Sequence, residues 1–101
     1  MIRTLARRLG IQPAAKRVVP ARHVVSTTHG ARTVLMDVRA GRYYTLDEVA
    51  SRIWTLAADG LPTTDIVQAV IAEYDVDADA AAADVSNFIA QMCKQKLMVA
   101  A

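Results

Sequence analysis

The chain has 101 residues, of which 53% are hydrophobic and 22% charged, and its formal net charge is +2. This length fits one domain, and the apolar content suffices for a packed core, which argues against disorder of the whole chain. The charge is uneven, because residues 1–22 hold six basic residues and no acid, whereas residues 23–101 hold six basic residues and all ten acids. The sequence therefore predicts a basic extension over residues 1–21 and a more acidic domain over residues 22–101, not a uniformly basic nucleic-acid-binding surface.

The extension begins with a short apolar pattern that prolines then interrupt. Ile2, Leu5 and Leu9 fall near one helical face, and two prolines follow within residues 11–21. We expect a frayed helix or a flexible tail, followed by a linker over residues 11–21. A docking element for a partner protein or an anionic surface is the alternative.

No apolar run approaches the roughly 20 residues that span a bilayer, and no apolar segment of a secretory signal follows the basic start. Cys93 is the single cysteine, so no intramolecular disulfide can form. A reducing, cytoplasmic compartment is the simplest interpretation.

Three segments rich in β-branched and aromatic residues predict strands. They are residues 24–28, 33–38 and 42–46, and turn signals separate them at residues 29–30 and 40–41. Short turns between consecutive strands imply an antiparallel meander. Because three strands cannot bury both faces of a sheet, helices must cover one face.

Three helices are expected after the strands. Asp47 caps the first, which ends at residues 59–60, Thr63 or Thr64 caps the second, and the third covers about residues 79–96. The residues expected to face inward are Val49, Ile53, Trp54 and Ala57, then Ile66, Val67, Val70, Ile71 and Tyr74, and finally Ala82, Val85, Phe88, Ile89 and Met92.

Residues 97–99 either form a short closing strand or simply pack against the rest. The order of elements predicts an α+β domain, a three-stranded antiparallel sheet followed by three helices. This arrangement is close to a winged helix in which the sheet comes first.

No pattern in the sequence supports catalysis or a metal site. The metal-ligating candidates Cys93, His23 and His29 are far apart and lack a characteristic spacing. The acids within residues 75–79 faintly resemble a calcium loop, but the glycine and the glutamate that such a loop requires are missing. No phosphate-binding glycine loop or nucleophile elbow is present either. We therefore expect neither an enzyme nor a bound metal or cofactor.

The most specific segment is residues 41–54, Gly-Arg-Tyr-Tyr-Thr-Leu-Asp-Glu-Val-Ala-Ser-Arg-Ile-Trp. It resembles the pattern of the pyrroloquinoline quinone biosynthesis protein D family, in which Gly-x-Tyr-x-x-Leu-Asn precedes an Ala and an Ile-Trp or Ile-Leu pair. The resemblance covers about residues 22–99, and Asp47 stands where the family often has Asn. Other segments that follow the order of the family are residues 34–37, 59–60, 63–66, 74–75, 84–85 and 88–89.

The resemblance implies a non-catalytic role. Members of the family bind the leader of a ribosomally made precursor peptide and present it to a modifying enzyme such as a leader peptidase, a cyclase or a radical enzyme. The form seen here is most similar to the standalone domains of lasso-peptide systems. By the family's geometry, the leader adds as a strand to residues 42–46. The peptide-binding residues that the resemblance implies are Arg42, Tyr43, Tyr44, Thr45 and Leu46 of the strand and Ala81, Asp84, Val85 and Phe88 of the third helix.

Several of these assignments stay open at the level of sequence. Tyr44 and Leu46 share strand parity, so one of the two tyrosines belongs to the core, but the period does not say which. Arg42 is either a solvated residue or a partner for an acid of the leader. Val85 and Phe88 belong either to the core or to a peptide-binding groove between residues 42–46 and the third helix.

The alternative function is that of a winged-helix nucleic-acid-binding or regulatory protein. The acidic second and third helices argue against it, because a helix that faces phosphates needs Lys and Arg. The chain is expected to be a monomer or a homodimer, since edge strands and Ala-rich helices both permit pairing of two copies.

Overall fold

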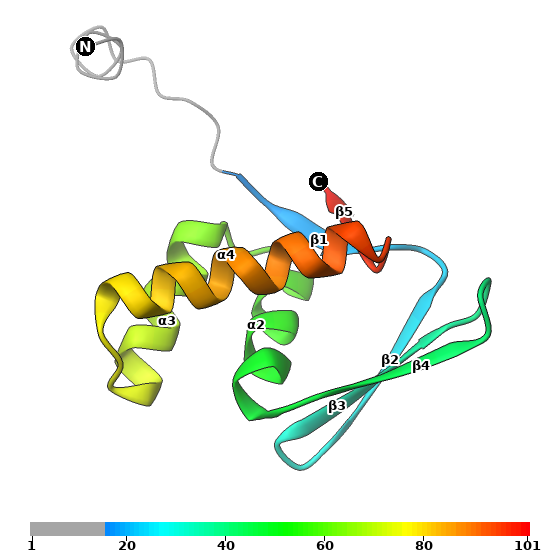
Figure 1. Cartoon of the computed structure of the whole chain (residues 1–101), viewed down its shortest axis with the longest axis horizontal. Coiled ribbons are helices and arrows are strands. Elements are labelled where there is room, and N and C mark those ends of the chain that lie inside the picture. Colours follow the sequence, from blue (N-terminus) through cyan, green and yellow to red (C-terminus); the bar gives the residue numbers. More distant parts are fainter. Residues whose placement is uncertain (1–15) are drawn as a thin grey trace, which may run out of the picture.

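The computed structural model describes residues 16–101 and shows three strands followed by three helices, with a short strand at each end (Figure 1). The sheet has the order β2-β3-β4, and both neighbouring pairs are antiparallel. The predicted α+β fold is therefore confirmed. The elements are β2 (Val24–His29), β3 (Arg32–Asp37), β4 (Arg42–Leu46), α2 (Glu48–Ala58), α3 (Thr63–Tyr74) and α4 (Ala78–Lys94).

The two ends of the described chain pair with each other. β1 (Val18–Pro20) and β5 (Met98–Ala100) form an antiparallel two-stranded sheet, so residues 97–99 contribute to the closing strand that was one of their two expected states. The linker predicted over residues 11–21 is wrong for β1, whose Val18 is only 3% exposed and belongs to the core. A strand with a single partner tolerates a proline, because the missing N–H can face away from the ladder. The packed domain thus begins upstream of the predicted boundary at residue 21, and residues 1–15 lie outside the described part.

Side-chain caps start α2 at Asp47 and α4 at Asp77, whereas a tertiary contact satisfies the start of α3. Asp47 accepts a hydrogen bond from the backbone N–H of Ala50 at 2.9 Å, which confirms the predicted cap of α2. Neither Thr63 nor Thr64 caps α3 as predicted, because the helix begins at Thr63 and its N-cap is Pro62, which makes no side-chain cap hydrogen bond. The backbone N–H of Thr63 donates to the carbonyl of Lys16 at 2.9 Å, so the chain that leads into β1 satisfies this helix end.

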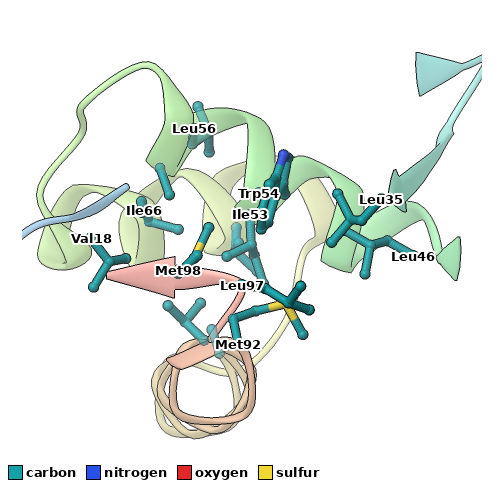
Figure 2. Packing of buried hydrophobic residues seen from close by; sticks show 14 residues of the cluster. Val18, Leu35, Leu46, Ile53, Trp54, Leu56, Ile66, Met92, Leu97 and Met98 are labelled. Atoms are coloured by element: carbon teal, nitrogen blue, oxygen red, sulfur yellow. The ribbon is translucent and has the colours of Figure 1, made fainter. Parts of the chain in front are cut away.

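The core lies among the three helices and the β1–β5 pair, and the three-stranded sheet adds Leu35 and Leu46 to it. Figure 2 shows Leu35 and Leu46 of the sheet gathered beside Ile53 and Trp54 of α2. Met98 lies in the same cluster and carries β5 into it. Each large apolar side chain buried in this way stabilises the fold by about 1.5–3 kcal/mol.

In the first turns of α4, the residue that faces inward is one position earlier than predicted. Ala81, Val85 and Met92 are buried, whereas Ala82, which was expected inside, is exposed. The run of identical alanines has no polar residue to mark the solvent side, so only packing against α3 sets the rotation of this turn.

Candidate functional site

Strand β4 has an open edge. It pairs with β3 on one side, and no other strand within residues 16–101 pairs with its second side. The backbone N–H and C=O groups of alternate residues along this side lack partners from the sheet, so an extended peptide can add there as a fourth strand. β2 forms the opposite edge of the same sheet, so the surroundings of each edge must decide between them.

The register of β4 against β3 decides which side chains face the core. Tyr44 lies opposite Leu35, which is fully buried, whereas Tyr43 lies opposite Met36 on the other face. Accordingly Tyr44 is half-buried against the core, and Tyr43 is 71% exposed. The structure thus settles the question that strand parity left open, since Tyr44 is the tyrosine on the inner face.

A pocket of about 490 Å³ lies between the inner face of the sheet and the end of α4 with β5. Strand β4 contributes Arg42 and Tyr44 to it, whereas no residue within the bounds of β2 lines it. This pocket therefore accompanies the β4 edge, whereas Thr28 of β2 lines only a smaller pocket of about 240 Å³. Its lining residues are His23, Asp37, Arg39, Ala40, Arg42, Tyr44, Cys93, Gln95, Lys96, Met98 and Val99.

The turn between β3 and β4 builds one wall of this pocket around Asp37. Its Oδ1 accepts hydrogen bonds from the backbone N–H groups of Arg39 and Ala40, each at 3.0 Å. The hydrogen bond from the Ala40 N–H has the largest effect and lowers the pKa of this carboxyl. Desolvation opposes it, whereas the hydrogen bond from the Arg39 N–H and the proximity of the His23 and Arg39 side chains lower the pKa further. Gly41 closes the turn with φ of 67°, a conformation that favours glycine.

Three of the lining residues, His23, Asp37 and Arg39, form a short polar chain. Asp37 Oδ2 lies 3.9 Å from His23 Nε2, and His23 Nδ1 lies 3.3 Å from a terminal nitrogen of Arg39. The sequence showed no such link, because His23 precedes its strand and Arg39 sits in a turn. Pairing of β2 with β3 brings them together, through the hydrogen bond from Val38 N–H to the His23 carbonyl at 3.0 Å.

The predicted peptide-binding residues divide into exposed and buried groups. Arg42, Tyr43 and Thr45 are exposed along β4, and Tyr44 is half-buried, so all four are accessible to a peptide at this edge. Leu46 is only 6% exposed and packs in the core.

The four predicted residues of α4 also divide into buried and accessible side chains. Ala81 and Val85 are 0% and 1% exposed, which places both in the core, and neither lines the pocket beside β4. They lie four residues apart on the face of α4 that packs inward. Asp84 is exposed and Phe88 half-buried, and neither lines the pocket beside β4.

Arg39 and Lys96 line the pocket, and the sequence did not identify either of them. Lys96 follows the end of α4 and had an ordinary explanation as a cation at a helix C-terminus. The turn after α4 brings it into the lining of the pocket that Arg42 also lines. No local pattern relates residues 39, 42 and 96, so no signal in the sequence was available to find this cluster.

Within residues 16–101, no group of three or more His, Cys, Asp or Glu side chains is placed to hold a metal ion. The same part of the chain contains no helix whose length and apolar character would let it cross a membrane. What the described residues offer at this edge is thus a strand, a pocket and a set of charged side chains.

Comparison with known proteins points to one family. A family model described as Coenzyme PQQ synthesis protein D (PqqD) matches residues 32–98. A solved structure described as TbiB1 in complex with the TbiA(beta) leader peptide is 34% identical, with a TM-score of 0.76 over 79% of this chain and 93% of that chain. A lasso peptide synthetase B1 complexed with the leader peptide has the same TM-score at 22% identity, over 82% of this chain and 98% of that chain, and shares the fold. No curated protein sequence matches significantly.

Proposed function

Since this chain belongs to the coenzyme PQQ synthesis protein D family, as residues 41–54 predicted, we propose that it binds the leader of a ribosomally made precursor peptide. The observation that carries the proposal is the open edge of β4 beside a pocket that two of its side chains line. The two similar structures support it, because each is a complex of a domain of this fold with a leader peptide.

The proposed mechanism is strand addition. The leader pairs with β4 along Arg42–Leu46, and main-chain hydrogen bonds to alternate residues set its register. Side chains on the two faces of the added strand then meet different surroundings. Those on the inner face reach Tyr44 and the pocket, and those on the outer face lie beside Tyr43 and Thr45.

The domain acts by holding its ligand rather than by chemistry. We propose that it delivers the leader to a separate modifying enzyme, which for a lasso peptide is the leader peptidase or the cyclase, and that it does so in the cytoplasm. The resemblance of the fold to a lasso peptide synthetase B1 supports this assignment. Binding by strand addition leaves one face of the leader exposed for the enzyme.

The proposal is tested by a titration of labelled leader with the purified chain, followed by fluorescence anisotropy. The cognate leader, from the precursor peptide encoded with this gene, should bind saturably, and the TbiA(beta) leader serves as a related probe. A proline scan of the leader supplies the evidence for strand pairing, because proline cannot donate a ladder hydrogen bond.

We expect proline to abolish binding at every second position of a short stretch and to be better tolerated between them. A cognate leader that does not bind the folded chain at tens of micromolar would refute the proposal. If the leader binds equally well with proline at every position, binding stands but strand addition is refuted.

A further inference from the structure

We propose that the pocket beside β4 binds an acidic side chain of the leader, so that the leader carries an aspartate or a glutamate at one defined position of its bound strand. This inference rests on the proposed function and deepens it, because it names the leader residue that the site selects. Three observations carry it: the charges in the pocket, the cations without partners, and the alternation of side chains along β4.

The pocket holds an excess of positive charge. Arg39, Arg42 and Lys96 line it against a single carboxylate, that of Asp37. That carboxylate is already engaged, since Oδ1 accepts two backbone N–H groups and Oδ2 lies 3.9 Å from His23 Nε2. The nearby C-terminus of α4 contributes roughly half a negative charge, which does not offset the cations.

Two of these cations have no partner in the described part of the chain. Arg42 and Lys96 are both exposed, and neither side chain makes a hydrogen bond or an ion pair within residues 16–101. Arg39 differs, because its guanidinium lies 3.3 Å from His23. A carboxylate that enters the pocket can therefore pair with the guanidinium of Arg42, which can bind both of its oxygens, and with the ammonium of Lys96, which lines the same pocket.

The alternation along β4 determines which leader residue reaches this pocket. Arg42 and Tyr44 are two residues apart and point to the same face of the sheet. A leader paired with β4 continues the sheet, so the residue opposite Arg42 points over the pocket and the residue two positions away lies beside Tyr44. We therefore expect the leader to carry an acidic and an apolar side chain separated by one residue.

Strand pairing also identifies the leader, rather than a free anion, as the source of the carboxylate. Once the backbone is paired, the side chain is held next to the pocket, at an effective concentration in the millimolar range. A small anion in solution has no such advantage over water at two exposed cations.

The test is a double-mutant cycle on leader affinity. Each acidic residue of the cognate leader is replaced in turn by its amide, and each peptide is titrated against the wild-type chain and against a variant with Arg42→Gln and Lys96→Asn. Asparagine is chosen at residue 96 because Lys96 has φ of 61°, which asparagine tolerates well. For one leader position, the amide should weaken binding to the wild type by about tenfold and change binding to the variant little.

Two controls accompany the cycle. Arg32→Gln removes an exposed arginine at the opposite end of the same sheet, outside the pocket, and should leave leader affinity unchanged. Moving the acid of the leader by one residue places it on the outer face of the sheet. A leader changed in this way should bind the wild type as weakly as the leader that carries the amide. The melting temperature of each protein variant should match that of the wild type, because the replaced side chains are exposed.

The outcomes separate this inference from the proposed function. If the wild type does not bind the unmodified leader, the proposed function fails. If the wild type binds it and the double variant binds equally well, only the inference about the pocket is overturned. If the double variant binds the leader normally but no longer retains the modifying enzyme in a pull-down, the pocket binds the enzyme and not the leader. That result would also overturn the inference.

Discussion

At the scale of single residues, Tyr43 and Tyr44 show how one strand serves both the core and the surface. Tyr44 lies opposite the buried Leu35, and Tyr43 points away from the core with 71% of its surface exposed. The hydroxyl and ring of Tyr43 therefore contribute little to folding, whereas the ring of Tyr44 excludes water from the edge of the core.

Replacement of each tyrosine by alanine should separate these roles. Tyr44→Ala should lower the free energy of unfolding by about 1–3 kcal/mol, whereas Tyr43→Ala should change it by less than about 0.5 kcal/mol. Urea denaturation measures both, and Tyr43→Ala should still weaken leader binding. A large loss of stability in Tyr43→Ala would show that its ring is part of the core.

The carboxylate of Asp37 should make stability depend on pH. Its pKa is lowered in the fold, chiefly by the hydrogen bond from the Ala40 N–H, so the charged form is the one that stabilises the turn. This stabilisation is complete above the ordinary carboxyl pKa of about 3.9 and is lost as the pH falls through the lowered value.

Asp37→Asn is the matching variant. It should be less stable than the wild type at neutral pH, and the difference should shrink progressively below about pH 4. Thermal unfolding at a series of pH values measures the difference. A gap that persists unchanged at low pH would mean that the charge of Asp37 has no part in it.

At the scale of elements, the pairing of β1 with β5 holds the end of α4 in place. The backbone N–H of Ala21 donates to the carbonyl of Leu97 at 3.0 Å, and Val18 is buried in the core. Leu97 and Met98, which follow α4, are buried too. Because Lys96 immediately precedes them, β1 helps to position one wall of the pocket.

Adjacent valines of β1 provide a matched test of this role. Val18→Ala should lower the free energy of unfolding by about 2 kcal/mol, because a buried side chain is truncated in a packed core. Val19→Ala should cost less, since Val19 is only half-buried. Urea denaturation of both variants measures the costs, and equal losses would argue against a core position for Val18.

At the scale of the whole molecule, charge is separated between the pocket and the helices. The cations Arg39, Arg42 and Lys96 gather at the pocket, whereas exposed acids such as Asp65 and Asp79 lie in the first turns of α3 and α4. A uniform basic face suited to a phosphate backbone is not formed by the described residues. The separation suits a peptide whose negative charge is concentrated at one end of its bound stretch.

The sequence by itself determined the elements and the family of this protein. β-branched and aromatic segments between turn signals placed the three strands, and helical periods placed the three helices. Asp47 marked the start of α2, because a cap is a contact between residues close in sequence. The segment 41–54 indicated the family because its turn, strand and helix start follow one another without interruption.

Only the tertiary structure decided which of these residues are exposed beside β4 and which are buried. Register against β3 placed Tyr44 inside and Tyr43 outside, and packing placed Ala81 and Val85 of α4 in the core. β1 escaped prediction because its burial depends on pairing with β5, some 80 residues later. The pocket was not predicted for the same reason. Contacts between residues distant in sequence bring Arg39, Arg42 and Lys96 together, and no local sequence pattern indicates such contacts.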